Sequence, residues 1–301
     1  MFSSKCIVLK NTMAENVRIS HGPFVGLPSI SGLTGLNRAF CVQLANGLHI
    51  SAAELQPHGI VLAIENYTPH YEFKTRFKPI KPSASPQREA IPAQYASFTA
   101  HFIMRVRPTT ERAQELLSAV DLRAASTAIM NRLRLCGGNL HSGRVLTTLR
   151  RADRESEELA ALRELPSFSL VLRDRADIVA AARESGLGMM ETLIASALPH
   201  NSRPTRYKEF FESQGTEYAS LAPVANGFLV LEDRVVARGT RMDATGAVPD
   251  AYPASATYTI AQLQKAAVLR AALNSEAPED PMVFWKEFHS DNAFLSHHIA
   301  L

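Results

Sequence analysis

The sequence predicts an α+β fold with a ferredoxin-like core, a helical insertion and a C-terminal extension. The order of the predicted elements supports this prediction, as do an apolar content of 46% and a charged fraction of 20%, which are typical of globular proteins. The first half contains, in order, a strand, a helix, two strands and a helix, and a fourth strand follows. That order is the split βαβ arrangement. RNA-recognition (RRM) domains share it, but so do many enzymes, and the order alone therefore leaves the function open.

The first predicted elements are a strand, a helix and a second strand. Residues 6–9 form a short apolar run with β-branched side chains, which is typical of a buried strand. A loop rich in Gly, Pro and Ser follows at 20–29, and Ser31 is then a suitable N-cap for a helix that ends at 46–47. The second strand covers residues 59–64. The spacing of apolar residues in the helix predicts a buried face of Leu33, Leu36, Phe40 and Leu44.

The middle of the chain combines a basic flap with a strongly alternating strand. The flap, residues 69–95, mixes prolines with cations and predicts an extended loop or a hairpin. Residues 97–107 alternate in the manner of a strand, and a helix is predicted at 109–134. One face of this strand is predicted to carry Phe98, Ala100, Phe102, Met104 and Val106. The other is predicted to carry Thr99, His101, Ile103, Arg105 and Arg107.

An amphipathic helix is predicted at 145–164, within an insertion at 140–165 that precedes the fourth strand at 167–172. We expect the core, flap and insertion to occupy residues 1–175. Residues 176–301 form the C-terminal extension that completes the fold. The elements predicted there are a helix at 174–198, a strand at 227–231 and a helix at 259–273, followed by an aromatic cluster.

Positive charge is concentrated in the middle of the sequence. Residues 74–151 hold 14 Lys and Arg against 4 Asp and Glu, whereas the rest of the chain holds 18 basic and 25 acidic residues. Such asymmetry favours a polyanion as partner of the middle segment, although a basic surface without a ligand has the same composition. Three cysteines without a CxxC spacing, a short apolar N-terminal run and no long apolar stretch favour a reducing cytoplasm, with no membrane contact.

The sequence lacks the common catalytic motifs. It contains no P-loop, no HExxH, no spaced Cys/His set and no GxSxG elbow, so neither a metal nor a cofactor is expected. A general acid–base ribonuclease needs a His, Tyr or Lys side chain within reach of a ribose hydroxyl. His21, Tyr71, Lys74 and His101 could converge in a ferredoxin-like fold, but nothing in their spacing requires it.

Two glycine-containing segments are candidates for binding a nucleotide backbone. Ser31, Gly32 and Thr34 lie at the start of the first helix, where unpaired N–H groups and the helix dipole attract phosphate. Ordinary capping and a tight strand–helix crossing would require the same residue types. At 131–140 two arginines precede a Gly pair, which suits either a phosphate-binding turn or a helix C-cap.

The flap interleaves aromatic side chains with cations, a pattern typical of proteins that bind single-stranded nucleic acids. Rings stack on bases while cations neutralise phosphates. Half-buried aromatic residues of a strand would give the same pattern. The residues concerned are Tyr71, Phe73, Phe77, Lys74, Arg76 and Lys78.

Three blocks in order resemble one family. GLPSISGLTGLNRA (26–39) resembles the N-terminal signature of the Cas-five-type, or second Csy, subunit of type I-F CRISPR surveillance complexes. RLRLCGGNL (132–140) is similar to that family's glycine-rich loop, and LPSFSLVLR (165–173) to the strand that follows. The resemblance covers residues 6–175. The insertion departs from the family pattern through Glu155, Glu157, Glu158 and Glu164, which indicates a variant subtype.

The resemblance implies an RRM-like fold of the RAMP type with a thumb-like insertion. It implies a non-catalytic subunit that binds the 5′ handle of the CRISPR RNA and caps the backbone of a Cascade-type (Csy) ribonucleoprotein in antiviral defence. Its partners would be the CRISPR RNA, the large subunit, the backbone subunit and, through the complex, target DNA. The alternative is a metal-independent endoribonuclease of the same superfamily that processes repeat RNA. The residues expected to contact RNA are Ser31, Gly32, Thr34, Arg38, Lys74, Arg76, Lys78, Arg132, Arg134, Gly137, Gly138, Arg144, Arg150 and Arg151.

Overall fold

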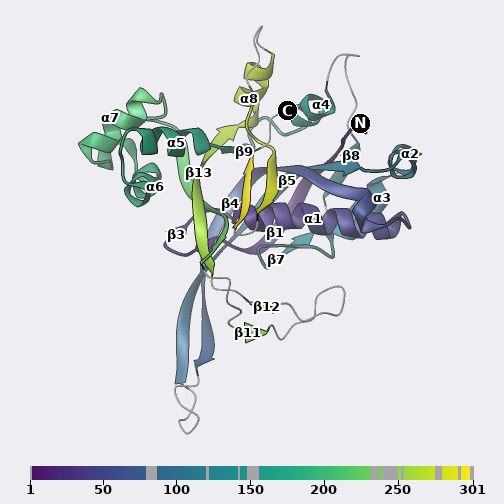
Figure 1. Cartoon of the computed structure of the whole chain (residues 1–301), viewed down its shortest axis with the longest axis horizontal. Helices are drawn as coiled ribbons and strands as arrows, with labels where there is room; N and C mark the ends of the chain where they lie inside the picture. Colours follow the sequence, from purple (N-terminus) through teal and green to yellow (C-terminus); the bar gives the residue numbers. More distant parts are fainter. Residues whose placement is uncertain are drawn as a thin grey trace.

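One large antiparallel sheet, covered by helices on both faces, organises the chain (Figure 1). The computed structural model describes residues 2–78, 87–119, 122–141, 143–147, 156–231, 237–238, 250–251, 254–274, 280–290 and 293–298. The strands of the large sheet are β1 (Lys5–Arg18), β4 (Leu55–Lys78), β5 (Gln87–Pro108), β6 (Arg134–Leu135), β7 (Gly138–His141), β8 (Arg144–Thr147), β9 (Leu170–Asp174), β10 (Ser220–Val230), β13 (Ala254–Lys265), β14 (Trp285–Ser290) and β15 (Ala293–His298).

Eight α-helices lie in the part of the chain that the structure describes. They are α1 (Ile30–Gly47), α2 (Glu111–Ala119), α3 (Leu122–Met130), α4 (Glu157–Arg163), α5 (Ala176–Glu184), α6 (Met189–Ala197), α7 (Thr205–Ser213) and α8 (Ala266–Leu273). Two further pairs of short strands form small sheets of their own: β2 (Ser20–His21) with β3 (Phe24–Val25), and β11 (Ala237–Arg238) with β12 (Asp250–Ala251). The fold is therefore mixed α/β with a large antiparallel sheet.

The strands of the C-terminal half extend the sheet of the N-terminal half. The order is β14-β15-β10-β13-β9-β4-β5-β1-β7-β6, and β8 also pairs with β1. Because β14 pairs with β4 as well, through Trp285 and Ile60, the six strands from β14 to β4 close into a ring. The Trp285 indole N–H donates to the Leu172 carbonyl of β9 at 3.1 Å, which strengthens this closure.

Apolar side chains on the two faces of the sheet form two cores. Along β1, Ile7 and Leu9 pack on the α1 face, whereas Cys6 and Val8 pack on the opposite face under α4 and α8. This alternation follows from the two-residue period of a strand. The predicted alternation of 97–107 is confirmed, since Phe102 joins the first core and Ile103 the second. A third core packs α5, α6 and α7 on β10 and β13.

The N-cap of helix α1 lies two residues earlier than the sequence predicts. Ser29, not Ser31, is the N-cap, and its hydroxyl accepts a hydrogen bond from the Gly32 N–H at 3.1 Å. The two serines are two residues apart, so either could have capped the helix from local sequence alone. The predicted buried face of Leu33, Leu36, Phe40 and Leu44 is confirmed, and all four side chains lie in the core.

Strands β4 and β5 pair from Leu55–Pro108 to Lys78–Gln87, with register shifts between Pro57 and Gly59 and between Glu65 and Thr68, and form a long hairpin. Its distal part projects from the body of the molecule, at the bottom of Figure 1. Of the two structures predicted for the flap, the hairpin is therefore the one found. The backbones of Lys74, Arg76 and Lys78 lie in this hairpin.

The strand predicted as the fourth of the core takes a different neighbour. In a split βαβ arrangement the fourth strand lies beside the first. Strand β9, which overlaps the predicted strand at 167–172, instead pairs with β4 and β13. The position beside β1 belongs to β7 and β8. Glycines allow this approach, because a Cβ on Gly138 would lie 2.6 Å from the Glu15 carbonyl oxygen and one on Gly143 would lie 1.9 Å from that of Lys10.

The predicted insertion is helical only in its last part among the residues described. Residues 144–147 form β8, and α4 begins after the Ser156 cap, whose hydroxyl accepts from the Leu159 N–H at 3.2 Å. Glu157 is buried and accepts from the Cys6 N–H at 2.9 Å, and Glu158 forms an ion pair with Arg105 at 2.9 Å. These two glutamates attach α4 to the sheet.

The helices predicted for the C-terminal half are wrong in extent. The helix predicted at 174–198 is two helices, α5 and α6, separated near Gly186, whose φ of 65° is unfavourable for other residues. The helix predicted at 259–273 begins only at α8, because residues up to Lys265 belong to β13 and pair with β10 and β9.

The helix predicted at 109–134, in the first half of the chain, contains α2 and α3. None of the helices described combines the length and the apolar character needed to cross a membrane.

Replacing Trp285 by phenylalanine tests the ring closure. The Leu172 carbonyl would lose its partner, and a small void would replace part of the indole. We expect Trp285→Phe to lower the free energy of unfolding by about 1–3 kcal/mol, measured by circular dichroism in urea. Phe168→Leu, at a side chain that is 82% exposed, serves as control and should change stability by less than about 0.5 kcal/mol. Equal stability of both variants would contradict the role given to Trp285.

Candidate nucleic-acid interface

A cleft of about 630 Å³ opens at the N-terminus of α1. We call it the α1 cleft. It brings together the end of β1, the β2–β3 hairpin, the turn between β6 and β7, and strands β10, β13 and β15. Its lining includes Arg18, His21, Ser29, Ser31, Gly32, Cys136, Phe228, Tyr258 and Phe294.

A free backbone donor lies on one side of the cleft. Ser29 caps the helix, and its hydroxyl and carbonyl accept from the N–H groups of Gly32 and Leu33. In the described part of the chain, the N–H group of Ser31, which lines the cleft, has no acceptor. Unpaired N–H groups at the first turn, together with the helix dipole, attract an anion.

The turn between β6 and β7 packs against the N-terminus of α1. The Cys136 Sγ lies 3.6 Å from the Ser29 Oγ, and the Arg18 N–H donates to the Cys136 carbonyl at 3.3 Å. A Cβ on Gly32 would lie 2.4 Å from the Cys136 Sγ, so only glycine permits the contact. The two glycine-containing segments of the sequence, about a hundred residues apart, therefore meet at one site.

Aromatic side chains form the opposite wall of the cleft. Phe228 on β10 is 48% exposed, and its backbone pairs with that of Phe294 on β15. Tyr258 on β13 packs edge-on against Phe24 at 5.1 Å, and its hydroxyl donates to the His21 carbonyl at 3.4 Å. An exposed aromatic ring is a surface on which a base of a single-stranded nucleic acid can stack.

Arg18 is the source of positive charge in the lining of the cleft, because His21 and Cys136 are both uncharged. Burial and the neighbouring Arg18 guanidinium lower the pKa of His21, so its imidazole is neutral at pH 7. Burial raises the pKa of the Cys136 thiol, which therefore stays protonated. Arg18 is exposed, and its Nε donates to the Ser20 carbonyl at 3.2 Å. The buried Nε2 of His21 has no partner among the residues described.

Some of the predicted contact residues lie in or beside the α1 cleft. Ser31 and Gly32 line it. Gly137 is exposed in the β6–β7 turn with a φ of 84°, and the exposed Arg134 of β6 donates to its carbonyl at 3.5 Å. Arg132 is exposed in the turn that precedes β6.

Other predicted residues serve the fold or lie apart. Gly138 is buried against the backbone of Glu15 and Val17, so its role is the approach of β7 to β1. Arg144 is exposed on β8 beside Lys10, well down β1 from the cleft.

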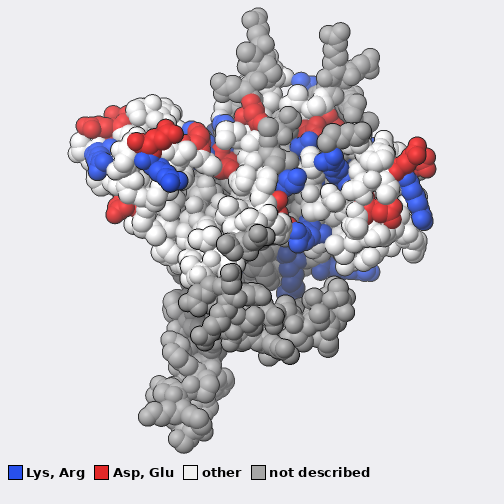
Figure 2. Space-filling view, viewed as in Figure 1, with Lys and Arg blue, Asp and Glu red and all other residues white. Residues whose placement is uncertain are grey.

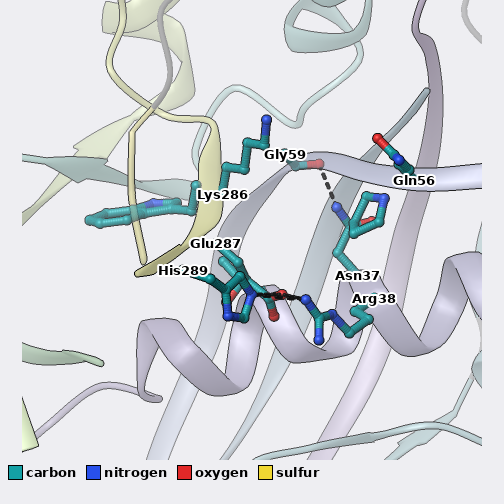
Figure 3. A pocket seen from close by; sticks show the side chains of 10 residues that line it. Asn37, Arg38, Gln56, Gly59, Lys286, Glu287 and His289 are labelled. Carbon is teal, nitrogen blue, oxygen red and sulfur yellow. Dashed lines mark hydrogen bonds and ion pairs between the residues drawn. The ribbon is translucent and has the colours of Figure 1, made fainter. Parts of the chain in front are cut away.

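Thr34 and Arg38 were predicted to contact RNA, and the structure turns both toward the C-terminal strands. The Thr34 side chain is buried, and its hydroxyl lies 2.8 Å from the Ser296 hydroxyl. Arg38 forms an ion pair with Glu287 at 2.8 Å and lies 2.9 Å from the His289 Nε2 (Figure 3). Residues four apart share one helix face, and this face of α1 meets β14 and β15 rather than the cleft.

The side chains of the remaining predicted cations lie outside the part of the chain that the structure describes. The side chains of Lys74, Arg76 and Lys78 lie outside the described residues, although their backbones belong to the hairpin. Arg150 and Arg151 lie outside the described residues altogether. Figure 2 shows basic side chains at the lower edge of the body, whereas the α5–α7 layer at the upper left carries acidic and basic side chains together.

Sequence reasoning missed the aromatic wall and Arg18. The strand at 227–231 and the aromatic tail were both identified, but no local spacing links Phe228, Tyr258 and Phe294 to a helix that begins at residue 30. Only the pairing of β10 with β13 and β15 brings the three rings to one side of the cleft. Among the residues described, no group of three His, Cys, Asp or Glu side chains could hold a metal ion.

A substitution at Gly32 tests the contact between α1 and the β6–β7 turn. We expect Gly32→Ala to lower the free energy of unfolding by about 1–3 kcal/mol, because its methyl group would overlap the Cys136 thiol. Combining it with Cys136→Ala should recover part of the loss, which a double-mutant cycle in urea measures. Gly35→Ala, at a helical position with open space around it, is the control and should raise stability by about 0.5–1 kcal/mol. Additive effects of the two first changes would argue against the contact.

A scan against protein-family models and a search of curated proteins give no match to this chain. A functional proposal therefore depends on the geometry of the cleft and on the sequence blocks described above.

Proposed function

We propose that this protein is a non-catalytic RNA-binding subunit that holds one end of a guide RNA in the α1 cleft. The observation that carries the proposal is the meeting of the α1 N-terminus and the β6–β7 turn opposite an aromatic wall. On the resemblance of the three sequence blocks, the assembly is a CRISPR surveillance complex of type I-F or a variant of it, and the bound segment is the 5′ handle.

Phosphate binding is supported by the donors on one side of the cleft. The N–H group of Ser31 is unpaired, and α1 is long enough, at 18 residues, for its dipole to favour an anion there. Arg18 lines the same cleft, and Arg132 and Arg134 are exposed at its edge. Cations and backbone donors of this kind bind the sugar–phosphate chain without reading its sequence.

Base stacking is supported by the rings on the other side. Phe228, Tyr258 and Phe294 come from three adjacent strands and face the phosphate-binding side across the cleft. Single-stranded RNA presents both a charged backbone and unstacked bases, whereas duplex RNA hides its bases. A cleft with both kinds of wall therefore favours a single strand.

The strand order also supports a ferredoxin-like, RRM-type core. Strands β7 and β8, β1, β5 and β4 lie side by side in that order, all antiparallel, and α1 connects β1 to β4. This is the order of a split βαβ unit if β7 and β8 together act as its fourth strand. The proposed core thus differs from the predicted one in which segment supplies that strand.

The partners proposed are the CRISPR RNA, the large and backbone subunits and, through the complex, target DNA. The direct test is to purify the tagged chain from its native cells, then sequence the RNA and identify the proteins that accompany it. We expect short RNAs that share one 5′ sequence. If the chain purifies with protein partners but without RNA, the result contradicts the proposal.

A metal-independent endoribonuclease is the second candidate, and the position of His21 favours it. Its neutral imidazole lies in the α1 cleft near Arg18 and Tyr258, as a general base would require. His101 is not part of this group, because it is fully buried and its Nδ1 accepts from the Asn11 N–H at 3.2 Å. Incubation of the pure chain with repeat RNA in EDTA decides: a discrete product that His21→Ala abolishes would establish the nuclease.

The aromatic wall predicts a loss of RNA affinity on truncation of Phe228. Removing one stacked base costs about 1–3 kcal/mol, which corresponds to roughly a 5- to 150-fold weaker Kd. We expect Phe228→Ala to show this loss in fluorescence anisotropy with a single-stranded RNA oligonucleotide. Phe168→Ala, whose side chain is also exposed but lies outside the cleft, should leave the Kd unchanged. An equal effect of both variants would contradict stacking in the cleft.

The turn arginines predict a change in salt dependence. Each phosphate neutralised on a single strand contributes about 0.7 to the slope of log K against log salt. We expect Arg132→Gln with Arg134→Gln to make this slope shallower by about 1.4, measured by anisotropy over a range of salt concentrations. Arg183→Gln with Lys208→Gln, on α5 and α7, is the matched control and should keep the slope. An unchanged slope in the first pair would exclude these arginines from the interface.

A further inference from the structure

A cluster of one arginine, one glutamate and one histidine joins α1 to β14 (Figure 3). The Arg38 Nη2 lies 2.8 Å from the Glu287 Oε2 and 2.9 Å from the His289 Nε2. Glu287 and His289 are two residues apart on β14, so both side chains are on the face of the strand that meets the helix. One guanidinium nitrogen therefore contacts both side chains of the strand.

The contact with Arg38 defines the protonation state of His289. A guanidinium group is always protonated in proteins and can only donate hydrogen bonds. The hydrogen bond between Arg38 and the His289 Nε2 therefore requires a lone pair on that ring nitrogen. In this arrangement the imidazole is neutral and carries its proton on Nδ1.

Glu287 is a second possible partner for His289. Its side chain is only 7% exposed, and its Oε2 lies 3.5 Å from the His289 Nε2. In the part of the chain that the structure describes, this oxygen accepts no hydrogen bond, so its contact with Arg38 is an ion pair without one. A buried carboxylate needs a cation close by. Arg38 supplies it when His289 is neutral.

A proton on the His289 Nε2 would reverse these contacts. Its N–H would then face the Arg38 Nη2, which is also a donor, and two positive charges would lie 2.9 Å apart. The same N–H would have the Glu287 carboxylate as an acceptor. The Arg38 side chain is 54% exposed, so it can turn into water, whereas the buried Glu287 keeps a cation beside it. Protonation therefore exchanges the two partners.

Few other ionisable groups face this cluster among the residues described. Helix α1 contributes the Cys41 thiol, whose pKa is raised by burial and then by Glu287, so the thiol stays protonated. On β14, Figure 3 shows the Lys286 amine directed away from Glu287 and His289. Strand β4 lines the adjoining pocket of about 270 Å³ with residues that do not ionise: Gln56, Pro57 and Gly59.

The imidazole also touches the wall of the α1 cleft. His289 pairs with Phe294 across β14 and β15, and the two rings pack edge-on with their centroids 4.9 Å apart. Phe294 lines the α1 cleft and pairs with Phe228 on β10. A change at His289 is therefore one side chain away from the aromatic wall.

We propose that Arg38, Glu287 and His289 form a pH-sensitive switch. Neutral His289 accepts from Arg38, and protonated His289 takes Glu287 as its partner and releases the Arg38 guanidinium beside the Phe294 ring. Histidine is the side chain that ordinarily changes charge between about pH 5 and 8. The proton comes from water and no bond between heavy atoms changes, so the switch is reversible.

Nuclear magnetic resonance of the whole chain tests the switch. With ¹⁵N-labelled histidine, we expect His289 to carry its proton on Nδ1 at about pH 8 and on both ring nitrogens at about pH 5. With ¹⁵N-labelled arginine, the Arg38 Nε shift should move toward that of a solvent-exposed arginine, with the same midpoint. The Phe294 ring protons should follow the same titration. Signals are assigned by comparison with His289→Gln and Arg38→Lys.

Matched histidine variants separate the switch from a general effect of pH. In His289→Gln the side-chain amide gains no proton, so the Arg38 shift should stay constant between about pH 8 and 5. His141→Gln, at an exposed histidine that contacts Glu15 at 3.3 Å, should leave the Arg38 titration as it is in the native chain.

Three results would overturn the proposal. These are a proton on the His289 Nε2 at about pH 8, an imidazole that keeps one protonation state down to about pH 5, and an Arg38 shift that does not follow His289. The first two are read from the native chain alone, so they do not depend on how a variant folds. The measurements contain no RNA and are independent of the function proposed for the α1 cleft.

Discussion

The buried indole of Trp285 is the contact on which the arrangement of the two halves depends. Its backbone pairs with that of Ile60, and its N–H donates to the Leu172 carbonyl, so one residue joins β14 to both β4 and β9. This closure places β14 and β15 against α1, where Ser296 meets Thr34. It also sets Phe294 at the α1 cleft. The C-terminal strands are thus part of the core that shapes the cleft, because without them the helix end would face no aromatic wall.

Three glycines allow backbone segments of the fold to approach one another closely. Gly138 and Gly143 let β7 and β8 lie against β1, and Gly32 lets the turn at Cys136 contact the helix cap. Any side chain at these positions would collide with a neighbouring backbone or with the thiol. Gly32 and Gly138, which belong to the two segments predicted to bind a nucleotide backbone, therefore have a structural role. Gly32 brings the β6–β7 turn to the N-terminus of α1.

The basic middle of the sequence supplies cations to two separate places. Arg132 and Arg134 lie at the turn beside the α1 cleft, whereas Arg105 and Arg107 lie at the opposite end of β1 and on the face away from α1. A count of charge along the chain cannot separate these groups, since β5 alone passes from one end of the sheet to the other. The turn arginines are exposed, while Arg105 is buried beside a cavity with an N–H left without an acceptor.

The sequence by itself determined the features that arise from neighbours a few residues apart. The buried face of α1 from Leu33 to Leu44 and the two faces of residues 97–107 follow from local periods of 3.6 and 2. Ser31 and Gly32 were placed at a helix start for the same reason. Only the tertiary structure decided that residues up to Lys265 form a strand, that β9 lies beside β4, that Thr34 and Arg38 face β14 and β15, and that Phe228 and Ser31 line one cleft. Those outcomes depend on which strands pair. Pairing is chosen by contacts between segments that are distant in the sequence, up to 262 residues for Thr34 and Ser296, and no local pattern records such contacts.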